Sequence, residues 1–340
     1  MSRLENPQAA WQKEPGRTLA VEPVIIPHPA SREILVRNHA VAINPLDWLL
    51  QDDALLPWLD YPAILGSDIA GEVVAVGDGV TRFRPGDRVL GQAVGTTINQ
   101  PSQGAFQTHT AVFENMAAPI PASMSYVDAA VLPLGLGTAA CGLYQGAHLG
   151  LAPPSATPSA TGETILVWGA ASSVGCNAIQ LAVASGYDCI AVASQSSALL
   201  LRQLGAVEVF DYRDPAIVDE VSHALEGRML AGALHATGNQ ADCVAVVSRS
   251  QGLRAIAMTL PPDTDPSASV KVTHIHGTSL KDDGIGDMIY RDFLPDVLAR
   301  GAYRAAPPAR IVGSGVAAFQ EALEIAKSGV SREKLVVTLP

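Results

Sequence analysis

A turn of small residues is the part of the chain best suited to chemistry. It runs Gly-Ala-Ala-Ser-Ser-Val-Gly over residues 169–175, between the apolar run Thr164–Trp168 and a helical pattern of apolar residues. Small side chains let the backbone approach a phosphate, and the first N–H groups of a helix favour negative charge. In the G-x-G-x-x-G register, alanine and serine take the first two glycine positions and only Gly175 is retained. We expect a dinucleotide pyrophosphate to contact Ala170, Ala171, Ser172, Ser173, Val174 and Gly175, and the alternative is a strand–turn–helix that binds no ligand.

Strand and helix patterns alternate along the chain after this turn. Short apolar runs typical of buried parallel strands include Thr164–Trp168, Asp188–Ala193 and Val207–Phe210, and helical patterns separate them. Later apolar runs at Leu234–Ala236 and Leu253–Met258 continue the alternation. Repeated strand–helix units predict right-handed crossovers, a doubly wound parallel sheet, and a ligand at the carboxyl ends of its strands.

The end of the second strand indicates which nicotinamide nucleotide would bind. An NAD site usually has an Asp or Glu there, which bonds the ribose 2′-hydroxyl, whereas this strand ends in Ser194-Gln-Ser-Ser197. A 2′-phosphate would therefore not be repelled. No Arg or Lys lies in this turn, so the expected partners of the phosphate are the hydroxyls of Ser194, Ser197 and Tyr212. The sequence favours NADP(H) as the cofactor.

Composition limits the class of protein. The chain has 340 residues, enough for two domains with their own cores, and 48% hydrophobic against 16% charged residues argues against a disordered chain. The net charge of −11 argues against nucleic acid as a partner. We find no apolar leader segment and no uninterrupted apolar window of about 18 residues, so no membrane partner is expected. Four cysteines without C-x-x-C spacing predict reduced core thiols and a cytoplasmic location.

The region before the turn has a different pattern. Short β runs bounded by Gly and Pro turns occur at Ile34–Val41, Gly71–Gly77, Asp87–Gly91 and Gly104–Val112. Many short strands of this kind predict a barrel-like β domain ahead of the parallel sheet. The run Leu151–Gly162, rich in Pro, Ser and Ala, is expected to form an exposed loop.

A further set of motifs extends over nearly the whole chain. The motifs are Val41-Ala-Ile-Asn-Pro-Leu-Asp-Trp48, Pro62–Gly77, Phe83–Val89, Leu132–Thr138, Leu204-Gly-Ala206, Val209–Tyr212 and Glu333–Val337. Together they resemble the medium-chain dehydrogenase/reductase superfamily. The similarity is greatest to its zinc-free, quinone-reductase-like branch, and within that branch to fungal enoyl reductases that act in trans on polyketide chains.

The resemblance implies an α/β fold of two domains. A GroES-like β-barrel catalytic domain would span residues 1–126 and be completed by residues 278–340. A Rossmann cofactor domain with a doubly wound parallel sheet would span residues 127–277. The nicotinamide would lie in the cleft between the domains. Both a monomer and a homodimer are compatible with the resemblance, since many members pair through an edge strand of the Rossmann sheet.

The positions that hold zinc in other members are changed here. Those members use Cys, His and Cys, and the matching residues of this chain are Asn44, Ser67 and Leu134. None offers a thiolate or an imidazole, and the four-cysteine structural lobe is also absent, so no metal is expected. Without a Lewis acid, the resemblance points to reduction of an activated C=C bond. Hydride would go to the β-carbon, and hydrogen bonds would stabilise the enolate before its α-carbon is protonated.

The same resemblance assigns candidate residues around the nicotinamide. Asn44, Asp47 and Trp48 match catalytic positions, although Asp47 is equally suited to capping the helix that begins near Pro45, and Trp48 to packing in the core. Lys334 matches a lysine near the cofactor, with a solvated lysine as the alternative. The full set expected on the cofactor side of this region is Asn44, Pro45, Thr138, Thr237, Gly277 and Lys334.

One position departs from related enoyl reductases. Several relatives have a lysine two residues after the aspartate, as a candidate proton donor, and here that residue is Leu49. The general acid would then be Tyr61, Tyr144, His109 or water. His235, where relatives often have Asp, is expected to be packed or bonded to backbone.

We therefore expect a zinc-independent, NADPH-dependent oxidoreductase that reduces an enoyl, enone or quinone-type double bond. Its substrate would be a small or carrier-tethered intermediate of secondary metabolism, with a polyketide synthase as a candidate partner. The alternative is a non-redox use of the scaffold, as an isomerase, a cyclase or a ligand-binding protein. Leu49 and the departures in the phosphate turn favour the alternative, and the strand–helix alternation favours the reductase.

Overall fold

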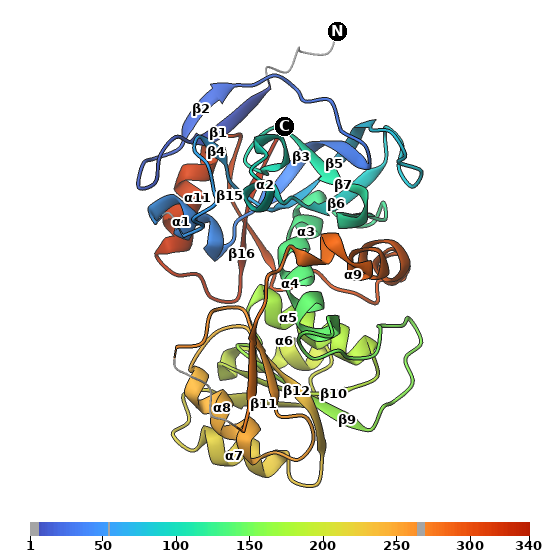
Figure 1. Ribbon diagram of the computed structural model, residues 1–340, viewed down its shortest axis with the longest axis vertical. Coiled ribbons are helices and arrows are strands. Elements are labelled where there is room, and N and C mark those ends of the chain that lie inside the picture. Colours follow the sequence, from blue (N-terminus) through green and yellow to red (C-terminus); the bar gives the residue numbers. More distant parts are fainter. Residues whose placement is uncertain (1–6, 54, 264–268) are drawn as a thin grey trace. The chain divides into compact units, whose positions relative to one another are not determined.

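Residues 7–53, 55–263 and 269–340 are described by the computed structural model, and Figure 1 traces their path. They form two units. One, which we call the GroES-like unit, consists of residues 1–134 and 308–340. The other, which we call the Rossmann unit, consists of residues 135–307.

The sheet of the Rossmann unit has six parallel strands in the order β11–β10–β9–β12–β13–β14. The strand order reverses between β9 and β12, so the switch point lies at the carboxyl end of β9, where a doubly wound sheet binds its ligand. The doubly wound parallel sheet expected from the sequence is confirmed. Its strands are β9 (Glu163–Trp168), β10 (Asp188–Ala193), β11 (Glu208–Asp211), β12 (Met229–His235), β13 (Ala255–Met258) and β14 (Lys271–His274).

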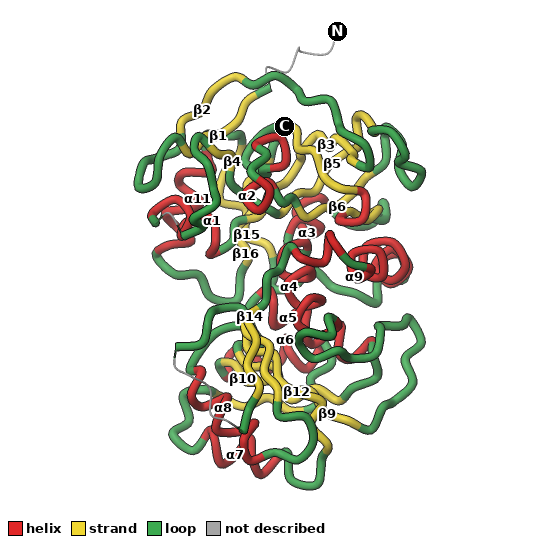
Figure 2. The backbone as a smooth tube through the Cα atoms, in the orientation of Figure 1, coloured by secondary structure: helices red, strands yellow, loops and turns green. Residues whose placement is uncertain are grey.

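Helices cover both faces of this sheet, as Figure 2 shows. On one face, α7 (Ile217–Ala224) and α8 (Gln240–Arg249) pack into a buried core with Ala233 of β12. On the other face, α4 (Pro133–Tyr144) comes so close to the sheet that a Cβ at Gly142 would lie 3.1 Å from Leu234. The remaining helices and helical turns are α5 (Ser173–Ala184), η3 (Gln195–Ser197), α6 (Ala198–Gln203), η4 (Ser279–Asp282), α9 (Gly284–Gly286), η5 (Asp287–Phe293) and α10 (Leu294–Ala299).

The boundaries of the units differ from the expected domain boundaries. Residues 127–134 lie in the GroES-like unit, and residues 278–307, expected to complete the catalytic domain, lie in the Rossmann unit. Hydrogen bonds to α5 hold the end of the latter segment, at Tyr303 and Arg304. The hydroxyl of Tyr303 donates to Oδ1 of Asn177 at 2.7 Å, and the side chain of Gln180 bonds the backbone N–H and carbonyl of Arg304 at 2.8 and 3.1 Å.

The GroES-like unit is built on a seven-stranded sheet. Its order is β15–β16–β3–β5–β6–β8, with β7 also paired to β3. The C-terminal segment returns to this unit over residues 308–340, where β16 pairs antiparallel with β3 and Val336 lies opposite Ala42. The strands are β3 (Glu33–Ala42), β5 (Asp68–Val76), β6 (Arg88–Gln92), β7 (His109–Phe113), β8 (Ala117–Pro119), β15 (Ala309–Ser314) and β16 (Lys334–Thr338).

A smaller sheet and several short helices complete this unit. The sheet has the strand order β2–β1–β4, with antiparallel pairing. Its strands are β1 (Gln8–Gln12), β2 (Ala20–Pro23) and β4 (Ala63–Ile64). The helices and helical turns are α1 (Pro45–Asp52), α2 (Gly95–Ile98), η1 (Pro101–Gln103), η2 (Glu114–Met116), α3 (Tyr126–Ala130) and α11 (Ala318–Lys327).

The strand expected at Gly104–Val112 is shorter than predicted. Only its second half forms a strand, β7. In the first half, the side chain of Gln107 donates to the carbonyl of Gly104 at 2.8 Å and to that of Pro101 at 2.9 Å. These local bonds hold the segment in turns, because a side-chain amide takes the place of the neighbouring strand.

Two other expectations are confirmed. All four cysteines are free and buried, and most of the run Leu151–Gly162 is an exposed loop.

One helical stretch of the described chain has the length and composition of a membrane span. It is Tyr126–Tyr144, with 19 residues and a mean hydropathy of 1.4. Of its apolar window, 78% is buried inside the protein, as in a core helix.

A stacked aromatic pair in the GroES-like unit provides a test of its core. Phe319 of α11 and Phe106 are both fully buried, with ring centroids 4.4 Å apart. Phe319→Ala leaves a cavity and is expected to lower the free energy of unfolding by about 3–5 kcal/mol. Ile311→Ala, at a side chain that is 58% exposed, is the control and should change it by less than about 0.5 kcal/mol. Urea denaturation measures both, and equal losses would contradict this packing.

Candidate functional site

The predicted phosphate turn lies at the carboxyl end of β9. Gly169 has a φ of +72°, and a Cβ there would lie 2.5 Å from the carbonyl oxygen of Thr237. A Cβ at Gly175 would lie 2.6 Å from the Cα of Ala170. Only glycine fits either position without displacing backbone. Gly175 and Thr237 are among the residues predicted from the sequence, whereas Gly169 was predicted as the start of the turn but not as a site residue.

The helix that follows this turn begins with a serine cap. Oγ of Ser172 accepts a hydrogen bond from the N–H of Gly175 at 3.0 Å. The cap satisfies one N–H group of the first turn of α5, and the hydroxyl proton of Ser172 stays available to a ligand. Ser173 lies against α4, because a Cβ at Gly135 would be 2.4 Å from its Oγ.

The serines predicted after β10 lie together. Oγ of Ser194 is 3.2 Å from Oγ of Ser197, which is buried.

A carboxylate that sequence reasoning missed lies beside this turn. Asp211, at the end of β11, accepts hydrogen bonds from the N–H groups of Gln195 and Arg213 at 3.1 and 3.0 Å. The N–H of Arg213 holds the pKa of Asp211 below its usual value. The end of the second strand alone predicts no carboxylate at this turn. That prediction is wrong, because Asp211 of β11 lies beside the turn in the folded protein. Parallel pairing places Asp211 opposite Ala193, and a motif read along one strand cannot show this.

A positive charge also lies at this edge of the sheet. The guanidinium of Arg213 lies over the ring of Tyr212, 5.1 Å from its centroid. Tyr212 is half exposed. The sequence analysis predicted Tyr212 as a phosphate partner and missed Arg213, whose signal is that it follows Tyr212 directly.

Two further predicted residues of the Rossmann unit are in contact. A Cβ at Gly277 would lie 2.2 Å from Oγ1 of Thr138, so only glycine permits this approach.

His235 is 1% exposed, and burial lowers the pKa of its imidazole. Its packed position is the one expected.

The candidate residues of the GroES-like unit form a buried charged cluster. Nζ of Lys334 lies 2.8 Å from Oδ2 of Asp68 and also donates to Oδ1 of Asn44. Nδ2 of Asn44 donates to the same oxygen of Asp68 at 2.8 Å. The side chains of Lys334 and Asp68 are 6% and 0% exposed. The alternative of a solvated lysine is therefore wrong, because β16 carries Lys334 into the interior beside the end of β3.

Asp47 caps the helix that Asn44 precedes. Its Oδ2 accepts a hydrogen bond from the N–H of Asn44 at 2.8 Å, and α1 begins at Pro45. Burial raises the pKa of the Asp47 carboxyl from 3.8 to about 7. The charge of Asp68 adds to the rise, while the N–H of Asn44 and the charge of Lys334 oppose it. The capping role is confirmed, and the carboxyl also titrates near neutral pH.

The remaining candidates have these places. Pro45 is exposed, and Trp48 is half-buried rather than part of the core. Two of the proposed proton donors have their hydroxyls committed: Tyr61 donates to the carbonyl of Leu50 at 3.2 Å, and Tyr144 to that of Leu181 at 3.1 Å. His109 is buried, with Nδ1 3.0 Å from Oγ1 of Thr108.

The chemistry of this cluster does not fit zinc. An ammonium, that of Lys334, is hydrogen-bonded to Asn44, the first of the three positions that match metal ligands. At the third position, Leu134, the backbone N–H donates to Oδ1 of Asp68. Within residues 7–53, 55–263 and 269–340, no three or more His, Cys, Asp or Glu are grouped so as to hold a metal ion. Zinc requires about four N, S or O ligands in a tetrahedral arrangement.

The raised pKa of Asp47 predicts a dependence of stability on pH. The folded state binds this proton more tightly than the unfolded state between about pH 4 and 7, so its contribution to stability falls as pH rises through that range. Asp47→Asn keeps an acceptor for Asn44 and removes the titration. The unfolding free energy of the wild type, relative to this variant, should fall by up to about 1.4 kcal/mol per pH unit. Urea denaturation across the range measures it, and parallel curves for the two proteins would refute the assignment.

Comparisons with known proteins agree with this architecture. Residues 30–122 match the alcohol dehydrogenase GroES-like domain. The chain is 46% identical to the dehydrogenase azaJ of Aspergillus niger, over 96% of this chain and 97% of that protein. It is 38% identical to the trans-enoyl reductase himH of Aspergillus japonicus, over 100% and 99%.

A solved structure shows the same fold over the whole chain. An alcohol dehydrogenase superfamily protein from Novosphingobium aromaticivorans superposes with a TM-score of 0.81 at 27% identity, over 98% of this chain and 100% of that one. From the sequence relatives, the matched domain and this fold, we conclude that the chain belongs to the medium-chain dehydrogenase/reductase superfamily of oxidoreductases, together with fungal proteins named dehydrogenases and trans-enoyl reductases.

Proposed function

We propose that this protein is a zinc-independent, NADPH-dependent reductase of an activated C=C bond. Its substrate is a small or carrier-tethered intermediate of secondary metabolism, and it acts in the cytoplasm with a polyketide synthase as its partner. The observation that carries the proposal is the buried cluster of Lys334, Asp68 and Asn44, in which an ammonium is bonded to a position that matches a metal ligand. The trans-enoyl reductase name of a relative with 38% identity supports the choice of an enoyl group.

The Rossmann unit would hold the nucleotide. Because Gly169 and Gly175 have no side chains, the backbone of the turn is open to a ligand, and the N-terminus of α5 would face the pyrophosphate. Thr138 and Gly277 are the candidate contacts for the nicotinamide end. A bound nicotinamide nucleotide supplies a hydride, and the protein supplies its orientation and the hydrogen bonds around the substrate.

The turn after β10 supports NADPH over NADH. Each oxygen of Asp211 accepts one backbone N–H group, which holds the carboxylate within the turn, although its charge opposes a 2′-phosphate. The guanidinium of Arg213, on the ring of Tyr212, brings the positive charge that a 2′-phosphate needs. The hydroxyls of Ser194 and Ser197 would complete the phosphate contacts.

In the GroES-like unit, Lys334 and Asp68 would fix the amide of Asn44. Lys334 holds its oxygen and Asp68 accepts one of its two N–H bonds. The second N–H of Asn44 is then oriented to donate to the enolate oxygen of the substrate or to the cofactor ribose. Several related enoyl reductases have a lysine where this chain has Leu49. Asp47 would hold the proton in place of that lysine, because the carboxyl of Asp47 titrates near neutral pH and accepts a hydrogen bond from the backbone N–H of Asn44.

Nucleotide binding tests the first half of the proposal. In a fluorescence titration with NADPH, Gly169→Ala is expected to weaken binding by at least about tenfold, because its Cβ would displace the turn from Thr237. Gly227→Ala is the matched control: Gly227 has a φ of +75° in the same unit, with nothing within 4 Å of its Cβ. If the wild type binds neither NADPH nor NADH at high micromolar concentration, the reductase proposal fails.

Turnover tests the second half. With a 2-enoyl thioester, an enone or a quinone as substrate, we expect NADPH oxidation that a chelator does not abolish. The double variant Asp68→Asn/Lys334→Gln leaves no unpaired buried charge, and it should lower kcat about 100-fold. Lys327→Gln, at an exposed lysine of α11, is the control.

Two results would count against this assignment. Full activity of the double variant would remove the role of the cluster. Tight NADPH binding without oxidation of NADPH by any of these substrates would favour the non-redox alternative, an isomerase or a cyclase.

A further inference from the structure

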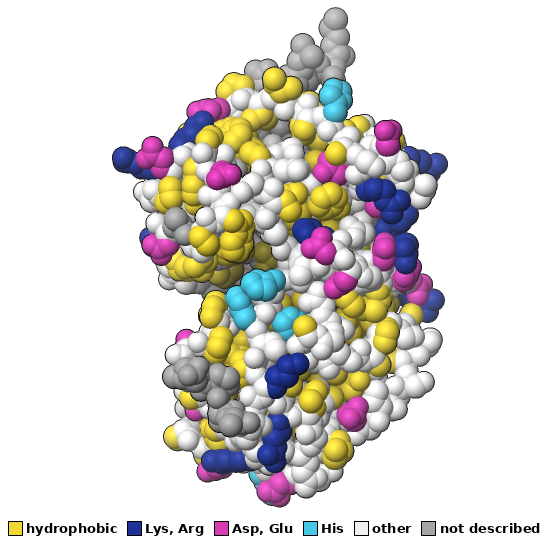
Figure 3. All heavy atoms as spheres, viewed as in Figure 1, with side chains coloured by type: hydrophobic (Ala, Val, Ile, Leu, Met, Phe, Trp, Pro, Cys, Tyr) yellow, Lys and Arg dark blue, Asp and Glu magenta, His cyan; other side chains and the backbone are white. Residues whose placement is uncertain are grey.

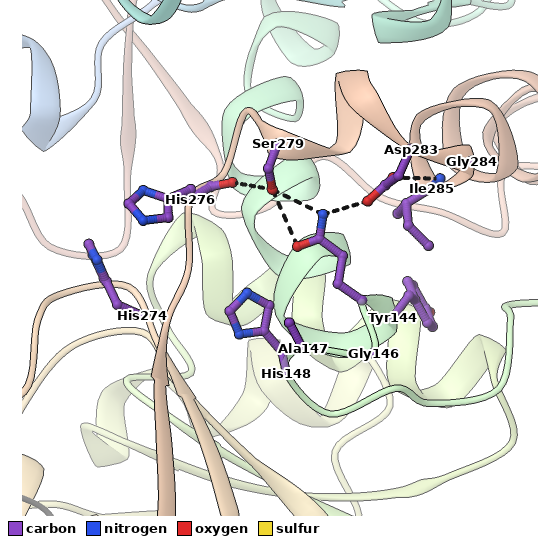
Figure 4. A pocket seen from close by; sticks show the side chains of 11 residues that line it. Tyr144, Gly146, Ala147, His148, His274, His276, Ser279, Asp283, Gly284 and Ile285 are labelled. Carbon is purple, nitrogen blue, oxygen red and sulfur yellow. Dashed lines mark hydrogen bonds between the residues drawn. The ribbon is translucent and has the colours of Figure 1, made fainter. Parts of the chain in front are cut away.

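A pocket opens on the Rossmann unit beside β14, the edge strand of its sheet. Its volume is about 590 Å³. The walls are the end of α4 with the loop after it, the end of β14, and the helical turns η4 and α9. Figure 3 shows a group of histidine side chains on the face of this unit that is in view, and Figure 4 shows the residues that line the pocket.

Three imidazoles meet at this pocket. His148 comes from the loop after α4, His274 ends β14, and His276 follows it. The rings of His274 and His276 lie edge to face with centroids 4.9 Å apart. The pair His274-x-His276 is thus at the surface, and a third histidine from a distant part of the chain joins it.

The hydrogen bonds of two of these histidines fix which ring nitrogen carries the proton. Nδ1 of His148 lies 2.7 Å from Oγ1 of Thr273, whose own hydroxyl donates to the carbonyl of Ile256. Nδ1 of His148 therefore donates, and Nε2 of the neutral ring carries no hydrogen. Nε2 of His274 lies 3.3 Å from the carbonyl oxygen of Thr259, which only accepts, so Nδ1 of His274 is bare. Each neutral ring has one nitrogen free to take up a proton.

The charged groups around the pocket are distributed unequally. Lys271 lies beside the imidazoles, with Nζ 3.0 Å from the carbonyl of Ala147. Burial lowers the pKa of His148, and the charges of Lys271, His276 and His274 lower it further. Burial also lowers the pKa of His274, with a smaller effect from His276. One side of the pocket thus carries four groups that are cationic when protonated.

The carboxylate of the pocket is on the other wall. Asp283 accepts hydrogen bonds from Nε2 of Gln145 at 2.7 Å and from the N–H of Ile285 at 2.9 Å. Oγ of Ser279 lies between the two sides, 3.0 Å from Nε2 of Gln145 (Figure 4). Tyr144 also lines the pocket, with its hydroxyl bonded to the carbonyl of Leu181. In the described part of the chain, the hydrogen bonds of this carboxylate come from neutral donors and not from the imidazoles.

We propose that this pocket binds a phosphate group on His148, His274 and His276, with Lys271 and Ser279 beside them, and that binding takes up protons. A phosphate dianion would offset the repulsion that protonation of His148 and His274 creates, and it would accept a charge-assisted hydrogen bond from each of these two rings. The phosphate belongs either to the inorganic ion or to a phosphate ester such as the 4′-phosphopantetheine arm of a carrier. The site does not depend on the reductase proposal, because none of its groups takes part in that reaction.

Histidine NMR of the wild-type protein during titration with inorganic phosphate tests the proposal. We expect Nε2 of His148 and Nδ1 of His274, which carry no hydrogen in the neutral rings, to become protonated as phosphate binds. Phosphate itself takes up a proton in this range, so affinity is calculated for the dianion. Calorimetry should show affinity for the dianion rising as pH falls from about 8 to 6, by up to tenfold per pH unit for each proton that the protein takes up. The double variant His148→Gln/His274→Gln should lose at least about tenfold in affinity. His223→Gln, at an exposed histidine of α7, is the control.

The outcomes separate cleanly. Tighter binding of 4′-phosphopantetheine than of inorganic phosphate assigns the site to a tethered arm, and equal or weaker binding assigns it to the free ion. No binding at about 10 mM of either, binding without a change at these two nitrogens, or affinity independent of pH would overturn the proposal. The wild-type spectra decide the matter even if the double variant does not fold.

Discussion

The ion pair between Lys334 and Asp68 is the interaction on which the candidate site of the GroES-like unit depends. Both side chains are removed from water, which costs several kcal/mol per ion, and only the pair together with further hydrogen bonds offsets that cost. Asn44 and the N–H of Leu134 supply those bonds. Because Lys334 begins β16 and Asp68 begins β5, the pair also ties the returning C-terminal segment to β5. The fold of this unit and the orientation of Asn44 are therefore set by the same contact.

In the Rossmann unit, close backbone approach plays the corresponding part. Gly169 against Thr237, Gly175 against Ala170, and Gly277 against Thr138 leave no room for a Cβ. Backbone N–H groups and a helix terminus bind phosphate without a particular side chain. This is why the turn can carry alanine and serine at two glycine positions of the usual fingerprint while its geometry is preserved. The candidate site of the Rossmann unit is thus formed by backbone, and that of the GroES-like unit by a buried charged cluster.

Local sequence patterns were sufficient to predict much of this structure, but they could not predict the contacts between distant segments. The apolar run Asp188–Ala193 is a strand with the predicted ends, because a buried parallel strand has a strong local signal. Asp211 was given no role, and the alternative of a solvated Lys334 stayed open, because their surroundings come from strand pairing, which a single run of sequence does not contain. The third histidine of the phosphate pocket lies more than a hundred residues before the other two, so no motif could include it.

The central claim is that this chain directs hydride to the β-carbon of an activated double bond without a metal. The most direct measurement is mass spectrometry of the product formed from a 2-enoyl thioester and NADPH that carries deuterium at both C4 positions, in the presence of a chelator. The account predicts a saturated product that carries one deuterium, located at the β-carbon. A product without deuterium, or a reaction that proceeds only when zinc is restored, would contradict it.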